Sequence, residues 1–227
     1  MENKILVELK GVKAFHRKKQ ILNGIDLTIN KGEFVYLIGK TGSGKSSVLK
    51  VLYNEMDISE GEGEIVGINL NKLKYSRVHK LRRQLGVIFQ DFQLLPDRSV
   101  RDNLIFVMKA TGWKDSKAME SHAELTLEQV SLPDVADKFP HQLSGGQQQK
   151  VAIARAMINS PKVILADEPT GNLDPESSNE IMNLLSAISK GGTAIIMATH
   201  DMVMVKDYPG RVLKCDEGLL TELDSIA

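Results

Sequence analysis

Residues 39–46 carry the stretch that decides the fold, and they read Gly39-Lys40-Thr41-Gly42-Ser43-Gly44-Lys45-Ser46. This stretch matches the phosphate-binding loop pattern G-x-x-x-x-G-K-[ST], whose glycines let backbone N–H groups wrap around phosphate oxygens. We expect Lys45 to reach the β- and γ-phosphates of a nucleotide and the Ser46 hydroxyl to bind Mg²⁺. A continuous apolar run at 33–38 predicts a buried strand before the loop, and 46–53 is expected to be a helix. The loop therefore predicts a nucleotide site in an α/β protein.

An acidic pair, Asp167 and Glu168, follows a second apolar strand that is expected at 163–166. Two carboxylates at the end of a buried strand are costly unless they have partners. Asp167 is expected to hold Mg²⁺ through water, and Glu168 to polarise the attacking water as a general base. The alternative is a pair that only caps the turn at 169–171, but the phosphate loop in the same chain favours nucleotide hydrolysis.

The composition is that of an ordinary globular protein. The chain has 227 residues, 42% of them hydrophobic, with 29 Lys and Arg against 29 Asp and Glu. The balanced charge argues against a protein that coats nucleic acid, because such proteins need surplus Lys and Arg. The longest apolar runs are five residues, whereas a spanning helix needs about 20. Cys215 is the single cysteine, which fits a reducing compartment. We expect a cytoplasmic protein with a sizeable core.

The order of the expected elements suggests one core with an insertion. Further strands are expected at 5–9, 61–66, 85–89 and 193–198, and helical patterns at 92–143 and 147–158. Strands on both sides of a helical middle predict an α/β core that is interrupted by a helical subdomain. We expect residues 1–90 and 160–227 to form the β-containing core and residues 91–159 the helical part. The segments 16–19 and 72–83 are expected to be solvated and polar.

Four further motifs make the chain resemble the ATP-binding cassette (ABC) ATPases. Leu143-Ser144-Gly145-Gly146-Gln147 resembles the signature motif of that family. Gln90 resembles its Q-loop glutamine, His200 its switch histidine, and residues 172–174 its D-loop. The motifs occur in the family's order across residues 39–200, so the resemblance covers essentially the whole chain.

This resemblance implies a fold, an activity and a set of site residues. The fold would be the P-loop NTPase core of the ABC type: a mostly parallel sheet with helices, an N-terminal antiparallel β part and an inserted α-helical subdomain. The activity would be hydrolysis of ATP with Mg²⁺, with Glu168, His200 and Gln90 as catalytic residues and Ser46, Gln90 and Asp167 at the metal. The residues expected to contact nucleotide are Phe15, Gly39, Lys40, Thr41, Gly42, Ser43, Gly44, Lys45, Ser46, Ser47, Gln90, Ser144, Gly145, Gly146, Gln147, Asp174 and His200.

The signature motif also implies a homodimer. Ser144 and two glycines precede an expected helix, so they form a second anion site at a helix N-terminus. In the family, two copies pack head to tail, and the signature of one copy closes on the γ-phosphate held by the other. Phe15 stands where the family stacks an aromatic side chain on adenine, with Phe in place of the more usual Tyr.

One stretch narrows the resemblance to a group within the family. Residues 89–100 read FQDFQLLPDRSV and look most like the cell-division group, the FtsE type. That group implies a homodimer beneath an FtsX-like membrane subunit, which transmits ATP-driven closure to peptidoglycan hydrolases outside. Phe92, Leu94, Leu95 and Pro96 would offer apolar anchors for such a subunit, beside Asp97 and Arg98. Ser47 and the pair Arg101-Asp102 depart from the usual pattern of the family.

Two other classes of function compete with this one. The first is the nucleotide-binding subunit of a lipoprotein-release or macrolide-export transporter, which shares much of the 89–100 stretch. The second is an ABC ATPase of DNA repair or translation, which the neutral charge and the single cassette disfavour. A phosphate-loop kinase or GTPase outside the ABC family has no need of residues 143–147.

Overall fold

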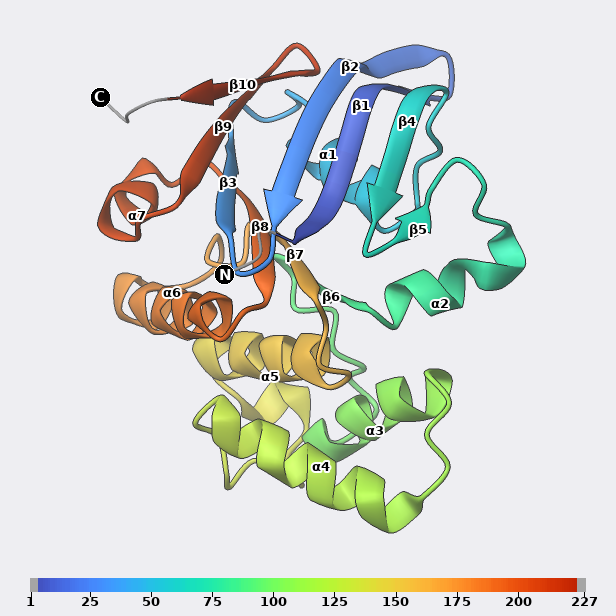
Figure 1. The fold of residues 1–227 in the computed structure, drawn as a ribbon. Helices are drawn as coiled ribbons and strands as arrows, with labels where there is room; N and C mark the ends of the chain where they lie inside the picture. Colours follow the sequence, from blue (N-terminus) through green and yellow to red (C-terminus); the bar gives the residue numbers. More distant parts are fainter. Residues whose placement is uncertain (1–3, 224–227) are drawn as a thin grey trace.

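Two β-sheets and a group of helices build the molecule, and the computed structural model describes residues 4–223 (Figure 1). Within those residues the larger sheet has the strand order β10-β9-β3-β8-β7-β6, and the smaller has the order β2-β1-β4-β5. The strands are β1 Ile5–His16, β2 Lys19–Asn30, β3 Phe34–Ile38, β4 Glu60–Ile65, β5 Ile68–Asn69, β6 Leu85–Ile88, β7 Val163–Asp167, β8 Ala194–Thr199, β9 Arg211–Asp216 and β10 Leu219–Leu223.

The helices connect these strands and cover the larger sheet. They are α1 Lys45–Leu52, α2 Val78–Arg82, α3 Val100–Ala110, α4 Ser116–Gln129, α5 Gly145–Met157, α6 Pro175–Lys190 and α7 Met202–Asp207, with 3₁₀ turns at Tyr75–Arg77 and Pro140–Gln142. Helices α3, α4 and α5 lie together on one side, away from the smaller sheet (Figure 1). None of the helices within residues 4–223 is long and apolar enough to cross a lipid bilayer.

The larger sheet is parallel from β9 to β6, and only β10 runs antiparallel to its neighbour. Its central strands β3, β7 and β8 are buried on both faces, and their successive side chains point to opposite sides. Ile164 and Ile195 pack in one core with helices α3 to α6, whereas Leu165 and Ile196 pack in a second core with α1 and the smaller sheet. Each such buried side chain contributes roughly 1.5–3 kcal/mol of hydrophobic stabilisation.

The sequence patterns missed several elements. The predicted strand at 5–9 runs on to His16, and residues 19–30 form a second long strand where Asn23-Gly24 had indicated a turn. The paired register of β1 and β2 shifts beside Val12, and Gly24 takes a positive φ of 90°, so the glycine accommodates an irregularity inside a continuous hairpin. The segment 72–83 was expected to be solvated and contains a 3₁₀ turn and α2. Helix α6 and strands β9 and β10 were not predicted.

The connection from β6 to α3 is irregular from residue 92 to residue 99, although the sequence predicted helix there. Asn103, which is 1% exposed, holds this loop from within α3. Its Oδ1 accepts a hydrogen bond from the Leu95 N–H at 2.8 Å. Its Nδ2 donates to the carbonyls of Leu95, Arg98 and Ser99 at 2.9–3.3 Å. One buried amide therefore satisfies four backbone groups of the loop.

We expect Asn103→Ala to lower the free energy of unfolding by about 1–3 kcal/mol, because the buried backbone groups of the loop lose their hydrogen-bond partner. Urea denaturation of the purified protein measures this difference. Lys109→Ala on the exposed face of α3 is the matched control and should change the free energy by less than about 0.5 kcal/mol. Equal stability of the two variants would contradict the role given to Asn103.

Candidate functional site

The phosphate-binding loop joins the end of β3 to the start of α1 and lies tightly against β9. Gly39 has a φ of 146°, and a Cβ at this position would stand 2.2 Å from the carbonyl oxygen of Cys215. Gly44 also has a positive φ, of 116°, and fits against the Cys215 sulfur and Leu22. These two positions accept only glycine, so the loop follows a path on which its backbone N–H groups are free of side chains. That is the cradle a phosphate group requires.

Lys45 begins α1 and is buried, with 6% of its surface exposed. Its ammonium group donates to the carbonyl oxygens of Gly39 at 2.8 Å and Lys40 at 3.2 Å. These contacts hold the lysine across the loop, with its charge beside the N-terminus of α1. A buried ammonium beside a glycine-rich loop and a helix N-terminus fits a polyphosphate ligand.

Ser46 and Asp167 face each other between α1 and the end of β7. The Ser46 hydroxyl donates to Asp167 Oδ1 at 3.1 Å. Burial raises the pKa of Asp167 above its usual value, and the bond from Ser46 acts in the opposite direction. A hydroxyl and a carboxylate oxygen side by side are hard ligands of the kind that Mg²⁺ prefers, so these residues fit the metal. No cluster of three or more His, Cys, Asp or Glu occurs in residues 4–223, so Mg²⁺ here would take further ligands from phosphates and water.

Glu168 and His200 meet at the neighbouring strand ends. Glu168 Oε2 lies 2.9 Å from His200 Nδ1, and the Glu168 N–H donates to the Ala198 carbonyl. Glu168 has a φ of 48°, in the left-handed region that non-glycine residues rarely adopt. Such strain persists only where the surroundings enforce it, and it is typical of functional positions. Both side chains line a pocket of about 340 Å³, together with residues of 170–178 and 199–204.

Gln90 follows β6 and is bonded to the turn after Glu168. Its Nε2 donates to Asn172 Oδ1 at 3.3 Å, and Asn172 Nδ2 donates to the Gln90 carbonyl at 3.0 Å. Gly171 leaves room for this pair, because a Cβ there would stand 2.9 Å from Gln90 Nε2. The structure therefore connects the expected Q-loop glutamine to the segment that leads to Asp174.

The expected signature residues begin α5 and pack against the start of α6. Ser144 caps α5: its hydroxyl accepts from the Gln147 N–H, and Gln147 Oε1 accepts from the Ser144 N–H. Asp174 caps α6 without such a return bond: its carboxylate accepts from the Ser177 N–H and hydroxyl, which lowers the pKa of Asp174. A Cβ on Gly146 would stand 2.8 Å from the Ser177 hydroxyl oxygen, so the glycine permits the close packing of the two helix ends.

Not all of the expected residues come together. No hydrogen bond or ion pair in the part of the chain from 4 to 223 connects residues 143–147 to the phosphate loop. Phe15 is 42% exposed near the end of β1, where it pairs with Gln20 of β2, and the following residues of β2 contact Gly44. Phe15 thus belongs to the hairpin that borders the phosphate loop. Ser47 is half-buried in the first turn of α1.

Two residues at the site were missed by the sequence reasoning. Gln149 is fully buried in α5 and donates through Nε2 to the Pro169 carbonyl at 2.7 Å, directly after Glu168. The Cys215 thiol donates to the Ser43 carbonyl at 3.1 Å and so supports the phosphate loop from β9. The only signal for Gln149 was its place two residues after the signature. Cys215 had no signal, because β9 itself was not predicted.

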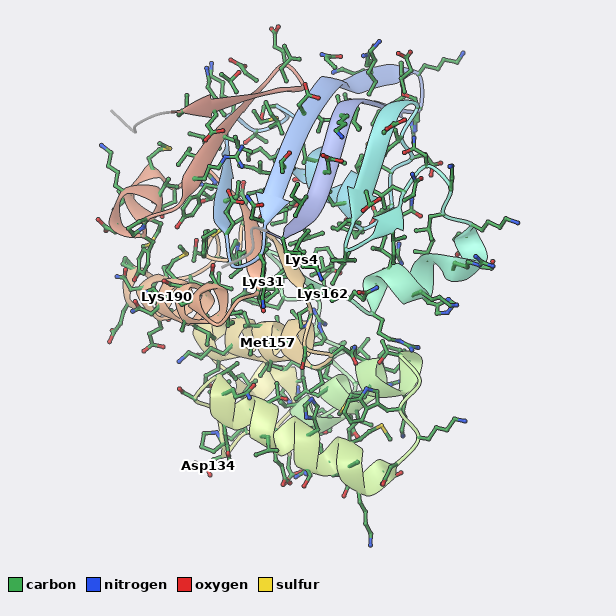
Figure 2. All side chains as sticks on the ribbon, viewed as in Figure 1. Lys4, Lys31, Asp134, Met157, Lys162 and Lys190 are labelled. Atoms are coloured by element: carbon green, nitrogen blue, oxygen red, sulfur yellow. The ribbon has the colours of Figure 1, made fainter. Side chains whose placement is uncertain are left out.

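Lysines gather at the end of the larger sheet where its parallel strands begin. Lys31 and Lys162 precede β3 and β7, and Lys190 ends α6 shortly before β8 (Figure 2). These lysines stand where the parallel strands begin, whereas Asp167, Glu168 and His200 stand where the strands end. The expected nucleotide site is therefore confined to the carboxyl edge, as is general for open parallel sheets.

Comparison with known proteins agrees with this geometry. Residues 22–171 match the family model described as "ABC transporter". The chain is 41% identical over 221 residues to the cell division ATP-binding protein FtsE of Streptococcus pneumoniae, covering 97% of this chain and 96% of that protein. It is 40% identical to the FtsE of Escherichia coli, covering 92% and 93%. The glutamine transport ATP-binding protein GlnQ of Bacillus subtilis is 37% identical, covering 96% and 89%.

Solved structures give the same result for the fold. The ATP-binding cassette MJ0796, in a dimeric post-hydrolysis state bound to ADP and Pi, superposes with a TM-score of 0.85 at 33% identity, covering 97% of this chain and all of that one. The expected P-loop NTPase core of the ABC type, with its antiparallel β part, is thereby confirmed. The chain belongs to the ABC transporter family, as one of its ATPases, which use ATP and Mg²⁺.

Proposed function

We propose that this chain is the ATP-hydrolysing subunit of a membrane complex of the cell-division, FtsE type. The observation that carries the hydrolytic part is the pair Glu168–His200, which lies 2.9 Å apart; Glu168 directly follows Asp167, the carboxylate that would hold Mg²⁺. The cell-division part is supported by the stretch at 89–100 and by FtsE relatives at 40–41% identity over most of the chain. The exporter alternative gains no support from these relatives.

Each residue of the loop and the strand ends would have one role in the reaction. The N–H groups of residues 39–46 and the Lys45 ammonium bind the phosphates and orient the γ-phosphoryl group. Ser46, Asp167 and Gln90 would hold Mg²⁺, which neutralises charge on the phosphate oxygens when bound. Glu168 takes a proton from the attacking water, and His200 orients the Glu168 carboxylate. Phe15 would stack on the adenine ring.

Full activity would require two copies of the chain. The N-terminus of α5, capped by Ser144 and without an acid in its first turn, offers N–H groups to an anion, yet it makes no bond to its own phosphate loop within residues 4–223. A second copy packed head to tail would bring its residues 144–147 to the γ-phosphate. The dimeric arrangement of the MJ0796 cassette supports this assembly.

The membrane partner would be FtsX-like and would hold the dimer at the inner, cytoplasmic face of the cell membrane. We place its docking surface at residues 92–98 and at an adjoining groove of about 300 Å³ between α2, α3 and α5. Arg155 joins the two, because it lines the groove and donates to the carbonyls of Phe92 and Gln93. ATP-driven closure would move the helical part, about residues 91–159, relative to the core at 1–90 and 160–227. That movement would control peptidoglycan hydrolases outside the cell.

The anchors of this docking surface differ from those the sequence suggested. Leu94 packs partly against the protein's own core, and the Leu95 backbone is bonded to Asn103. Pro96 and Asp97 are exposed, and Arg98 lies 4.6 Å over the ring of Phe106. The free contacts for a partner are therefore Pro96, Asp97 and the Arg98–Phe106 pair rather than both leucines.

The first prediction concerns Asp167 and uses protein without Mg²⁺ or nucleotide. Because burial raises its pKa in the folded state, folding becomes less favourable as the pH rises through that pKa. Asp167→Asn removes the buried charge and keeps an acceptor for Ser46. We expect this variant to melt at a higher temperature than wild type at neutral pH. The difference should shrink as the pH falls, since the carboxyl is then protonated in both states. A lower melting temperature at neutral pH would contradict this account.

The second prediction concerns hydrolysis. Glu168→Gln should bind ATP with Mg²⁺ but lose at least about 10²-fold in turnover, because an amide cannot accept the proton of water. With ATP it should accumulate as a dimer, seen as a doubled mass in light scattering. Lys45→Ala is the control for binding: it should bind little ATP and stay monomeric. A Glu168→Gln protein with wild-type turnover would refute the assignment of the base.

The third prediction concerns the partner and compares two exposed acids. Asp97→Lys should release the chain from membranes that contain its membrane subunit, while Asp207→Lys at the end of α7 should leave it bound. Both variants should keep the ATPase activity of the isolated chain, since neither residue belongs to the nucleotide site. Membrane fractions probed for the chain give the readout. If Asp97→Lys stays bound as wild type does, the docking surface lies elsewhere.

A further inference from the structure

The segment 72–83, here called the basic segment, stands out from the rest of this neutral chain. It contains Lys72, Lys74, Arg77, Lys80, Arg82 and Arg83, and no Asp or Glu occurs from residue 65 to residue 90. The nucleotide chemistry uses none of these residues. A net charge concentrated in this way acts on charged partners, whatever the total charge of the chain.

The fold turns these cations outward. Val78 and Leu81 anchor the segment in the interior, while all six Lys and Arg side chains are exposed. None of the six forms an ion pair with an acid in residues 4–223. The segment projects at one side of the molecule, between the smaller sheet and α3 (Figure 1). Its positive charge is therefore not balanced locally.

Tyr75 adds an independent observation. It begins the 3₁₀ turn of the basic segment and is 95% exposed, the most exposed of the large hydrophobic side chains in the described residues. An exposed aromatic ring with a polar end, flanked in the sequence by Lys74 and Arg77, is typical of a contact with the headgroup region of a bilayer.

The basic segment adjoins the groove proposed to bind the membrane subunit. His79, Arg82 and Arg83 line the same groove of about 300 Å³ that the proposed function assigns to the membrane subunit. A chain docked through this groove would turn the basic segment toward the bilayer surface. The two features therefore share one face of the molecule.

We propose that the basic segment binds the anionic headgroups of a lipid bilayer, with Tyr75 in the interfacial layer. For its orientation this inference rests on the proposed function. Clusters of about four to eight Lys and Arg are sufficient for reversible attraction to an anionic leaflet. One attachment of this kind binds a membrane only weakly, and the docked membrane subunit would supply a second attachment. The lipid contact would add to the affinity for the complex and orient the chain beneath it.

A lipid surface fits better than a nucleic acid. The segment starts directly after Asn71, which is bonded to Gly63 of β4, and the exposed Glu62 and Glu64 lie on that strand. These carboxylates would repel a long polyanion that continued past the segment. Contact with a flat bilayer can be limited to the projecting turn and α2.

The test uses the full chain and protein-free vesicles, so it needs neither nucleotide nor membrane subunit. Wild-type protein should sediment with vesicles of phosphatidylcholine and phosphatidylglycerol, should not sediment with phosphatidylcholine alone, and should be released by high salt. The triple variant Lys74→Glu, Arg77→Glu, Lys80→Glu should bind at least about tenfold more weakly. The control Lys109→Glu, Lys114→Glu, Lys117→Glu carries the same charge change on exposed positions of α3, the link to α4 and the first turn of α4, and should bind as wild type.

Tyr75→Ser is the second variant, because it changes no charge. It should weaken vesicle binding severalfold with an unchanged melting temperature. This variant still tests the inference if the triple variant folds poorly. No sedimentation of wild type with anionic vesicles, equal loss in the control, or tighter binding to duplex DNA than to vesicles would each overturn the inference. Loss of ATPase activity in Glu168→Gln tests the proposed function separately, since vesicle binding does not depend on hydrolysis.

Discussion

The alignment of three parallel strands is the constraint on which the rest of this ATPase depends. Ile38 at the end of β3 is paired with Thr199 of β8, and Ala198 of β8 is paired with Asp167 of β7. The phosphate loop follows Ile38, His200 follows Thr199, and Asp167 ends β7 directly before Glu168. These groups therefore lie at the same height along the carboxyl ends of the strands. Slippage of any strand by one residue would exchange its two buried faces and remove its functional side chain from that level. The two cores on either side of the sheet therefore also fix the geometry of the site.

A second set of contacts links this edge to the helices that would reach another copy. Gln90, Asn172 and the turn after Glu168 are bonded to one another, and the first turns of α5 and α6 are packed closely enough to require Gly146. Gln149 continues this path from α5 to the carbonyl after Glu168. The residues proposed for the chain's own nucleotide and those proposed to reach the nucleotide of a second copy thus belong to one connected group. A displacement of α5 cannot leave the turn at 168–171 unaffected.

The sequence predicted the parts of this molecule that consist of short local patterns. The loop at 39–46, the acidic pair and the signature each combine residue types and spacing that chemistry dictates, and buried parallel strands give continuous apolar runs. The β1–β2 hairpin was only partly predicted, because Gly24 resembles a turn residue and lies at a strand irregularity instead. Strands β9 and β10 alternate weakly in polarity, and their place beside β3 is set by pairing across the whole chain. The roles of Asn103 and Gln149 could not be predicted for a related reason: their hydrogen-bond partners are backbone groups, which no pattern of side chains reveals.

The contact between Cys215 and the phosphate loop has an experimental consequence of its own. Cys215 is the only thiol in the chain, is 1% exposed, and has a pKa raised by burial, so the intact fold shields it from alkylating reagents. It reacts only when the β9–β10 hairpin separates from Ser43, whose carbonyl is also bonded to the Gly218 N–H. The labelling rate of this one sulfur therefore reports the local opening of the hairpin and the loop as a unit. The wild-type protein therefore carries its own probe of this opening, which can be read with and without nucleotide.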